Sequence, residues 1–296
     1  MEEFKKRLSG KWVLAGEYSV LRSSLALVYP LDHYYIDFYY KETEDWLVIN
    51  RKGDHKAGLD FAVTPLLNRT LKALNKQKED LKGHLVIEGN LPFGAGLGAS
   101  AVLCAGMSHL CLYKNWINKN QLNSFATSLE DFFHGKSSGM DVAVVLKKKA
   151  ILYQKSKTLK VLDNFKHRPL LYLSYSGGRA STSVGVSKVR KLFDENWTLA
   201  EEIDKQMNQS AEICLQALKE EDKEKSLSLL KSALNLGYDS FKKWKLISYD
   251  LEQHIRILKK EGALAVKPTG SGLGGYVISL WDRQPPKGLQ LIALQI

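Results

Sequence analysis

Residues 94–100 limit the possible folds of this 296-residue chain more than any other segment, because they place three glycines within five positions. A strand-like run at residues 85–88 precedes them, and an apolar stretch at 101–113 that predicts a helix follows. Closely spaced glycines let backbone N–H groups approach an anion, and the N-terminus of the next helix adds partial positive charge. Taken alone, the segment favours equally a phosphate-binding loop and a tight strand-to-helix turn.

The spacing of these glycines excludes two common nucleotide-binding motifs. The segment does not end in Gly-Lys-Ser or Gly-Lys-Thr, so it is not a Walker A loop. The order G-A-G-L-G also breaks the G-x-G-x-x-G spacing of a dinucleotide-binding fold.

The rest of the chain predicts a mixed α+β protein. Helical spacing or helix-forming composition predicts helices at residues 61–78, 101–113 and 121–133 and over most of 183–260. Short apolar or aromatic runs predict strands at residues 12–15, 25–28, 34–40, 46–50, 85–88, 170–174 and 276–281. We expect two domains, residues 1–165 and 166–296, because the pattern becomes mainly helical after the strand at 170–174.

The formal charge of +11 favours anionic partners, which include nucleic acid, membrane surfaces and phosphorylated small molecules. Much of the excess lies in scattered clusters such as residues 147–149, which are typical of solvated turns. Nucleic-acid binding through stacked bases needs aromatic residues interleaved with Lys or Arg, and no motif here supplies them. We therefore expect a small-molecule substrate and no nucleic-acid partner.

Cysteine usage and hydropathy indicate a cytoplasmic protein. The chain has an odd number of cysteines, Cys104, Cys111 and Cys214, and no two of them form a C-x-x-C pair. This argues against a disulfide framework and against a zinc site. The first residues lack the apolar core of a signal peptide, and no stretch reaches the roughly 18 apolar residues of a membrane span. We expect no membrane partner.

The order of residues in the glycine-rich segment is specific. The sequence PFGAGLGASA at residues 92–101 resembles the phosphate loop of the GHMP kinases, written P-x-x-x-G-L-G-S-S-A. Ala99 replaces the first serine of that pattern, whereas Ser100 keeps the second, which in relatives carries a hydroxyl near the magnesium ion. The resemblance implies that ATP is held by eight residues of this segment: Pro92, Gly94, Ala95, Gly96, Leu97, Gly98, Ala99 and Ser100.

Three further segments resemble GHMP kinases, in family order. GKWVLAGEYSVL at residues 10–21 is similar to G-K-x-x-L-x-G-E-[HY]-x-V-x, and EDFFHGKSSGMD at 130–141 to the H-G-x-P-S-G-[IVL]-D segment of mevalonate kinases with its upstream glutamate. KPTGSGLGG at 267–275 is similar to the loop K-x-T-G-[AS]-G-x-G-G, with Leu273 in place of a common glycine. The four segments span nearly the entire chain.

The resemblance implies an ATP- and Mg²⁺-dependent small-molecule kinase with a ribosomal-S5-like N-terminal domain and a ferredoxin-like C-terminal domain. Ser100 and Glu130 are then expected to bind Mg²⁺, and Asp141 to orient or deprotonate the attacking hydroxyl. Lys11 is expected to lie near Asp141, to keep it ionised and to neutralise the transferring group. The residues expected at the acceptor are Glu17, Tyr18, His134, Ser138, Gly139, Arg179, Thr182, Gly270, Ser271 and Gly272.

The acceptor is less constrained, because function depends on the site and not on the fold. The spacing from Glu130 to Asp141 is that of mevalonate kinases and favours phosphorylation of mevalonate in isoprenoid biosynthesis. Tyr18 stands where mevalonate kinases have histidine, and Gly-Glu-Tyr is closer to phosphomevalonate kinases. The segment at residues 176–183 resembles both the Arg-Ser-Thr stretch of mevalonate kinases, with Ala180 inserted, and the Ala-Ser-Thr of phosphomevalonate kinases, so it does not separate the two. Phosphomevalonate or another hydroxyl compound as acceptor, and a non-catalytic binding protein of the same fold, remain alternatives, and either a monomer or a homodimer fits.

Overall fold

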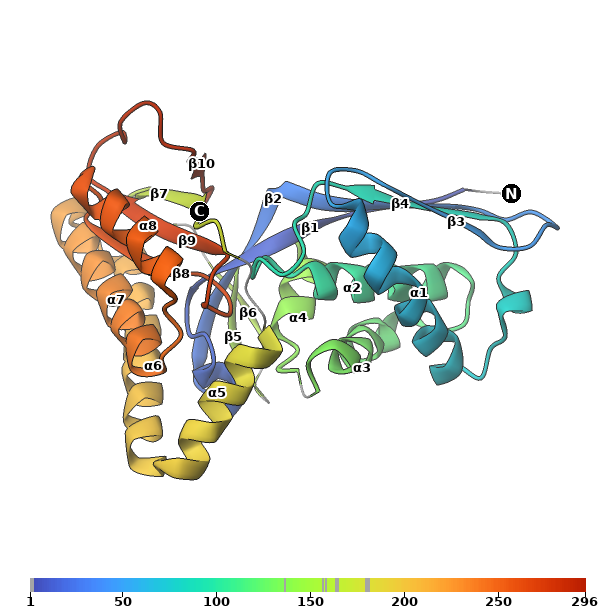
Figure 1. Ribbon diagram of the computed structural model, residues 1–296, viewed down its shortest axis with the longest axis horizontal. Coiled ribbons are helices and arrows are strands. Elements are labelled where there is room, and N and C mark those ends of the chain that lie inside the picture. Colours follow the sequence, from blue (N-terminus) through green and yellow to red (C-terminus); the bar gives the residue numbers. More distant parts are fainter. Residues whose placement is uncertain (1–2, 136, 156, 158, 163–164, 179–181) are drawn as a thin grey trace. The chain divides into compact units, whose positions relative to one another are not determined.

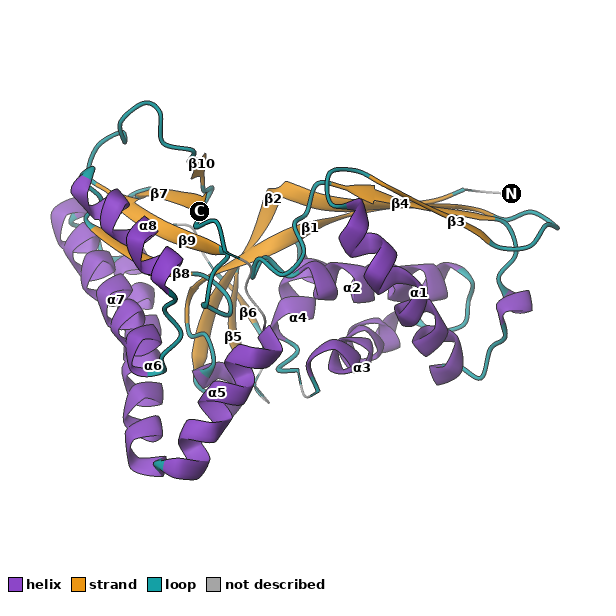
Figure 2. Cartoon of the chain, in the orientation of Figure 1, coloured by secondary structure: helices purple, strands orange, loops and turns teal. Residues whose placement is uncertain are grey.

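The computed structural model describes residues 3–135, 137–155, 157, 159–162, 165–178 and 182–296, and it confirms a mixed α+β chain (Figures 1 and 2). The α-helices are α1 Lys56–Ala73, α2 Ala99–Tyr113, α3 Leu122–His134, α4 Met140–Lys147, α5 Thr182–Glu195, α6 Trp197–Lys219, α7 Lys223–Lys243 and α8 Tyr249–Lys260. The strands are β1 Phe4–Ala15, β2 Leu25–Lys41, β3 Val48–Lys52, β4 His84–Gly89, β5 Ile151–Gln154, β6 Lys160–Val161, β7 Leu170–Tyr175, β8 Ala265–Pro268, β9 Tyr276–Trp281 and β10 Ile292–Ala293.

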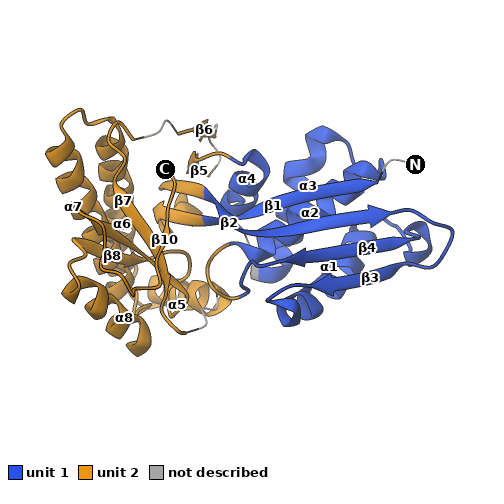
Figure 3. Ribbon diagram, turned by 90° about the horizontal axis from the view of Figure 1, so that it is seen from above, with its two compact units in different colours: residues 1–11, 30–93, 98–148 blue, residues 12–29, 94–97, 149–296 orange. Residues whose placement is uncertain are grey.

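The chain divides into two compact units, each built from separate stretches of sequence (Figure 3). The first unit contains residues 1–11, 30–93 and 98–148, and the second contains 12–29, 94–97 and 149–296. These units interleave along the chain, whereas the expected division into 1–165 and 166–296 cuts it once. That domain boundary stays a prediction.

In the first unit, α2 packs against α1, α3 and α4, and β4 pairs parallel with β3 and antiparallel with residues 36–41 of β2. The side chains of α2 are buried along most of the helix, in agreement with its largely apolar sequence. Cys104 and Cys111 belong to this buried surface, and Cys214 is buried in α6. All three are unpaired thiols, as their spacing predicts.

In the second unit, strands pair antiparallel in the order β10-β7-β9-β8, and α7 and α8 pack against β8. Helices α6 and α7 lie side by side. The long helices begin at side-chain caps: Asn196 accepts from the amide of Leu199, and Ser248 accepts from that of Leu251. Local sequence therefore sets where α6 and α8 begin, while burial against the sheet and the neighbouring helices stabilises them.

Two predicted boundaries were wrong for identifiable reasons. Pro30 suggests a turn, yet it lies inside the single strand β2, between residues 25–28 that pair with β5 and 36–41 that pair with β4, where neither ladder needs its missing N–H. The helix predicted to reach residue 78 ends at Ala73, because Asn75 takes a left-handed φ of 52° and the amide of Lys76 bonds back to the Leu71 carbonyl. That is a Schellman ending with asparagine in the glycine position.

One missed element affects the candidate site. Residues 140–147 form helix α4, which is absent from the helices that the sequence predicts. Asp141 therefore lies in the first turn of a helix, where a carboxylate is stabilised by the helix dipole.

Candidate active site

Lys11 and Asp141 form an ion pair in the first unit, with 3.0 Å between Nζ and Oδ2. Lys11 lies on β1 with its side chain buried, and Asp141 on α4 is about one quarter exposed. Proximity of these two residues is what the sequence predicts. Asp141 Oδ1 is buried and has no hydrogen-bond partner among the described residues, so this carboxylate can still accept a proton or a hydrogen bond.

Glu130 places a second carboxylate in the same unit, from the last turns of α3, and it is almost fully buried. Burial, and next the charge of Asp141, raise the pKa of Glu130 well above its ordinary value, while Ser137 and Lys11 act in the opposite direction. The Ser137 hydroxyl donates to Glu130 Oε2 at 2.5 Å. Ser137 stands where mevalonate kinases usually have proline, and the sequence assigned it no role.

These groups fit the chemistry of a magnesium site. Mg²⁺ prefers one or two protein carboxylates or hydroxyls completed by phosphate oxygens and water, and it dehydrates reluctantly. A buried carboxylate with a raised pKa, beside an oxygen that lacks a partner, is an environment that a cation would stabilise. Among the described residues there is no group of three or more His, Cys, Asp or Glu side chains that could hold a metal alone.

The phosphate loop alternates between left-handed glycines and buried side chains. Gly94, Gly96 and Gly98 have φ of 68°, 82° and 80°, and the intervening Ala95 and Leu97 are buried. The loop ends at Gly98, the N-cap of α2, so Ala99 and Ser100 are the first two residues of that helix. Backbone amides in a first helical turn have no acceptor within the helix, which makes this end suitable for an anion.

Gly98 also lies against Lys11. A Cβ added at Gly98 would approach the Lys11 side chain to 2.8 Å at Cγ. The close fit shows why glycine is required here beyond its positive φ. It also ties the start of α2 to the residue that pairs with Asp141.

The segment between Glu130 and Asp141 is organised by serines. The Ser137 amide donates to Asp131 Oδ1 at 2.6 Å, and Ser137 Oγ accepts from the Gly139 amide at 3.0 Å. Ser138 Oγ accepts from the Met140 amide at the start of α4. Ser138 and Gly139, both predicted to contact the acceptor, thus lie directly before Asp141 at the N-terminus of α4.

In the second unit, the C-terminal glycine loop begins at a buried ion pair. Lys267 Nζ donates to Glu17 Oε1 at 2.6 Å, and the two side chains are 0% and 3% exposed. Thr269 Oγ1 accepts from the Val13 amide at 2.8 Å and donates to the Val13 carbonyl at 3.1 Å. Glu17 was predicted to contact the acceptor, and the geometry gives it a buried lysine as partner.

Two glycine-rich segments of the second unit approach each other directly. A Cβ at Gly270 would lie 2.7 Å from the Gly96 carbonyl oxygen, and one at Gly275 would lie 2.6 Å from the Ala95 carbonyl oxygen. Backbones this close leave no space for side chains. The fold therefore brings residues 94–97 of the phosphate loop against the loop at residues 269–275.

Tyr18 and Ser271 are also together. The Tyr18 hydroxyl donates to the Ser271 carbonyl at 2.6 Å, and burial, then the Glu17 carboxylate, raise the Tyr18 pKa far above its ordinary value. The hydroxyl therefore stays protonated as a donor. Ser271 Oγ is buried without a partner among the described residues, and it remains available to a ligand.

Three remaining residues predicted to contact the acceptor lie at helix ends or in the C-terminal loop. His134 is the last residue of α3, Thr182 is the first of α5, and Gly272 lies in the C-terminal loop. Arg179 lies outside the described residues.

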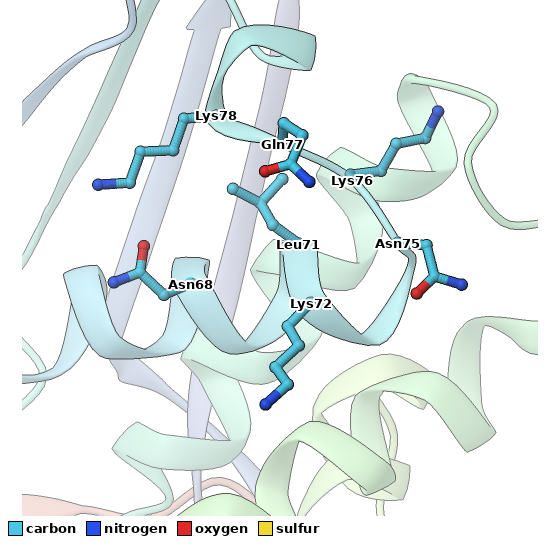
Figure 4. Close-up of a pocket in the computed structure, with 7 residues that line it drawn as sticks. All are labelled: Asn68, Leu71, Lys72, Asn75, Lys76, Gln77 and Lys78. Carbon is cyan, nitrogen blue, oxygen red and sulfur yellow. The ribbon is translucent and has the colours of Figure 1, made fainter.

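A pocket of about 340 Å³ at the end of α1 contains none of the predicted site residues. Figure 4 shows that the side chains of Lys72, Lys76 and Lys78 around it point in different directions, so they do not converge on one anion. Its lining residues are Asn68, Leu71, Lys72, Asn75, Lys76, Gln77 and Lys78. Within the described part of the chain, no helix combines the length and the apolar character that crossing a bilayer requires.

The sequence of this chain is similar to those of known proteins. Residues 65–149 match the family model described as GHMP kinases N terminal domain. A mevalonate kinase of Aeropyrum pernix is 25% identical over 297 residues, covering 96% of this chain and 90% of the relative.

Solved structures share the fold at lower identity. The mevalonate kinase of L. major, solved in complex with R-mevalonate, superposes with a TM-score of 0.75 at 22% identity, covering 95% of this chain and 88% of that one. Phosphomevalonate kinase of Streptococcus pneumoniae gives a TM-score of 0.67 at 15% identity, covering 96% and 92%. The matched segment at residues 65–149, the four motifs and the fold all relate this chain to the GHMP kinases.

Proposed function

We propose that this chain transfers the γ-phosphoryl group of ATP to a hydroxyl of a small acceptor, and that the acceptor is mevalonate. The observation that carries the proposal is the Lys11–Asp141 ion pair beside the buried Glu130. Kinases of small molecules need a base for the acceptor, a cation near the phosphates and an amide-lined loop. This chain has residues suited to each part.

In the proposed reaction, the acceptor oxygen forms a bond to the γ-phosphorus while the bond from that phosphorus to the β,γ-bridging oxygen breaks. Asp141 accepts the hydroxyl proton, and ADP leaves with the electrons of the broken bond. Lys11 holds Asp141 in place and offsets negative charge on the transferred group. The amides at the start of α2 and in residues 94–98 bind phosphate oxygens.

Mg²⁺, when bound, would neutralise phosphate charge and orient the transferred group. Ser100 and Glu130 are the residues proposed to hold it, and Ser137 would orient the Glu130 carboxylate through its hydrogen bond. The proposed acceptor contacts of the first unit are foremost Ser138 and Gly139, which lie directly before Asp141.

Mevalonate is preferred over phosphomevalonate for two reasons. The separation of Glu130 and Asp141 follows the mevalonate kinase pattern, and the matching relatives include the mevalonate kinases of Aeropyrum pernix and Archaeoglobus fulgidus. A cytoplasmic location, and a monomer or homodimer, remain predictions from the sequence.

The test is a coupled ADP-release assay with Mg·ATP, offering mevalonate, phosphomevalonate, homoserine and galactose in parallel to the purified protein. Turnover of mevalonate alone is expected. Turnover of phosphomevalonate alone would reassign the acceptor and leave the kinase chemistry intact. Absence of turnover on every acceptor, with ATP still bound, would support a non-catalytic binding protein instead.

A further inference from the structure

Two positions at which this chain differs from residues common in related kinases, Tyr18 and Leu273, meet in one hydrophobic cluster of the second unit. Tyr18 stands where mevalonate kinases have histidine, and Leu273 where the C-terminal loop commonly has glycine. Leu273 packs against the cluster, whose buried members are Tyr18, Val189, Ile203, Met207, Phe241, Trp244 and Leu246. The two departures are therefore related in space.

Both residues are held in an unusual backbone conformation. Tyr18 has φ of 61° and Leu273 has φ of 63°, a region in which bulky side chains are rare. Strained residues persist only where the surrounding contacts over-determine them, and they concentrate at functional sites. The contacts around these two residues should therefore explain the strain.

Tyr18 is fixed on all sides. Its hydroxyl donates to the Ser271 carbonyl at 2.6 Å, and its ring packs edge-on against Phe241 and Trp244, with centroids 6.2 and 5.3 Å away. A Cβ at Gly185 would lie 2.1 Å from the Tyr18 hydroxyl oxygen, so this glycine inside α5 leaves the space that the hydroxyl fills.

The loop is fixed from its other side through Leu273. The Leu273 amide donates to the Leu246 carbonyl at 2.7 Å, and its side chain lies on the cluster that contains Leu246. A Cβ at Gly272 would lie 2.7 Å from that same carbonyl oxygen. Ser271, through Tyr18, and Leu273, through Leu246, thus connect both sides of Gly272 to the same cluster.

We propose that Tyr18 and Leu273 are positioning residues that hold the loop at residues 269–275 in a single conformation. The Tyr18 hydroxyl donates its hydrogen bond to this loop and does not bind the acceptor. The Tyr18 hydroxyl already donates a hydrogen bond to the Ser271 carbonyl. Leucine at position 273 has less backbone freedom than glycine and adds apolar contact with the cluster. The consequence for catalysis rests on the proposed function, whereas the ordering of the loop does not.

Hydrogen exchange followed by mass spectrometry tests the ordering without ATP or acceptor. Tyr18→Phe keeps the ring and removes the donor, and we expect exchange in peptides covering 269–275 to become about tenfold faster. Tyr238→Phe is the matched control: its hydroxyl also donates at 2.6 Å, to Glu252, and its side chain is equally buried, but it belongs to a different cluster. It should leave exchange in the loop unchanged.

Leu273→Gly provides a second variant that relieves the strained φ and is therefore expected to fold. It should also accelerate exchange in the loop, and the double variant should fall short of the product of the single effects, because both act on one element. Wild-type exchange in both single variants would overturn the proposal.

Kinetics separates positioning from acceptor binding. If Tyr18 positions the loop, Tyr18→Phe should lower kcat several-fold and leave the acceptor KM within about twofold. A rise of about tenfold or more in acceptor KM with unchanged loop exchange would instead place the hydroxyl on the acceptor and overturn the proposal. If no acceptor is turned over, the proposed function fails. The hydrogen-exchange result still decides whether Tyr18 and Leu273 position the loop.

Discussion

Asp141 lies at the N-terminus of α4 with one carboxylate oxygen 3.0 Å from the ammonium of Lys11 and the other buried without a partner among the described residues. This arrangement leaves one side of the carboxylate for a proton and uses the other for orientation. An asparagine has the same shape and cannot serve as a base.

Asp141→Asn is therefore expected to reduce kcat by about 10²–10⁴-fold, the usual contribution of a general base, with ATP binding retained. ADP release and nucleotide affinity measured on the same preparation check this. Asp60→Asn is the control, because Asp60 is half-exposed on α1 and pairs with Lys56. Near-normal kcat in Asp141→Asn would remove Asp141 from the reaction.

Ser137→Ala should raise the Mg²⁺ concentration for half-maximal activity by about 10-fold or more. The hydroxyl bonded to Glu130 is expected to orient a metal-binding carboxylate, and losing such a partner typically weakens metal affinity by about 10–100-fold. A magnesium titration of ADP release gives the value. Ser128→Ala, on the exposed part of α3 where the hydroxyl donates to the Phe125 carbonyl, should not shift this concentration. An unchanged Mg²⁺ requirement in Ser137→Ala would contradict the assignment of Glu130.

Gly98→Ala is expected to lower kcat/KM by up to about 10²-fold. The new methyl group would push on Lys11, and a misplacement near 1 Å is enough for such a loss. Gly288→Ala also introduces Cβ at a positive φ, 102°, but it meets no atom within 4 Å, so it separates backbone strain from displacement of Lys11. Equal activity of the two variants would show that Lys11 tolerates the shift.

Lys267→Met should destabilise the protein by about 3–5 kcal/mol, because it removes the buried ammonium group that pairs with the Glu17 carboxylate. Urea unfolding measures the change. The double variant Lys267→Met/Glu17→Gln should recover part of the loss, since no buried charge remains. Lys191→Met breaks an exposed pair with Glu195 and is expected to change the free energy of unfolding by under about 0.5 kcal/mol. A similarly small effect at Lys267 would mean that water reaches Glu17.

Stability should fall in mildly acidic solution through His109. Burial, then Lys6 and Lys148, lower the pKa of His109 to about 4, whereas the unfolded chain titrates near 6.5. Between these values the unfolded state binds more protons, so the free energy of unfolding decreases as the pH falls from about 6.5 towards 4. Because His109 is only partly buried, it contributes at most about 2 kcal/mol to the loss in free energy of unfolding between pH 7 and pH 5.

The measurement compares urea midpoints at pH 7 and pH 5 for the natural protein and His109→Gln. The variant should lose less stability on acidification, because glutamine does not titrate. An identical loss in both proteins would assign the acid sensitivity to other groups.

The periodic patterns were sufficient to predict the α+β class, because helix and strand periodicity are local properties. The proximity of Lys11 to Asp141, which are far apart in the sequence, was predicted only from the resemblance of their motifs to those of GHMP kinases. The helices that begin at Asn196 and Ser248 follow from capping side chains. The ending of α1 was also readable in principle, since Asn75 is a residue that adopts the left-handed conformation readily.

The tertiary structure alone revealed the partners of groups that are distant in sequence or that depart from the motif. No spacing rule pairs Lys267 with Glu17 or Tyr18 with Ser271, and the hydrogen bond from Ser137 to Glu130 arises at a position where the family pattern has no hydroxyl. Glycine spacing and helix caps act within a few residues, so they can be recognised in the sequence alone. Buried charges and hydroxyls must instead find whatever partner the folded chain brings within about 3 Å, and that is decided by packing.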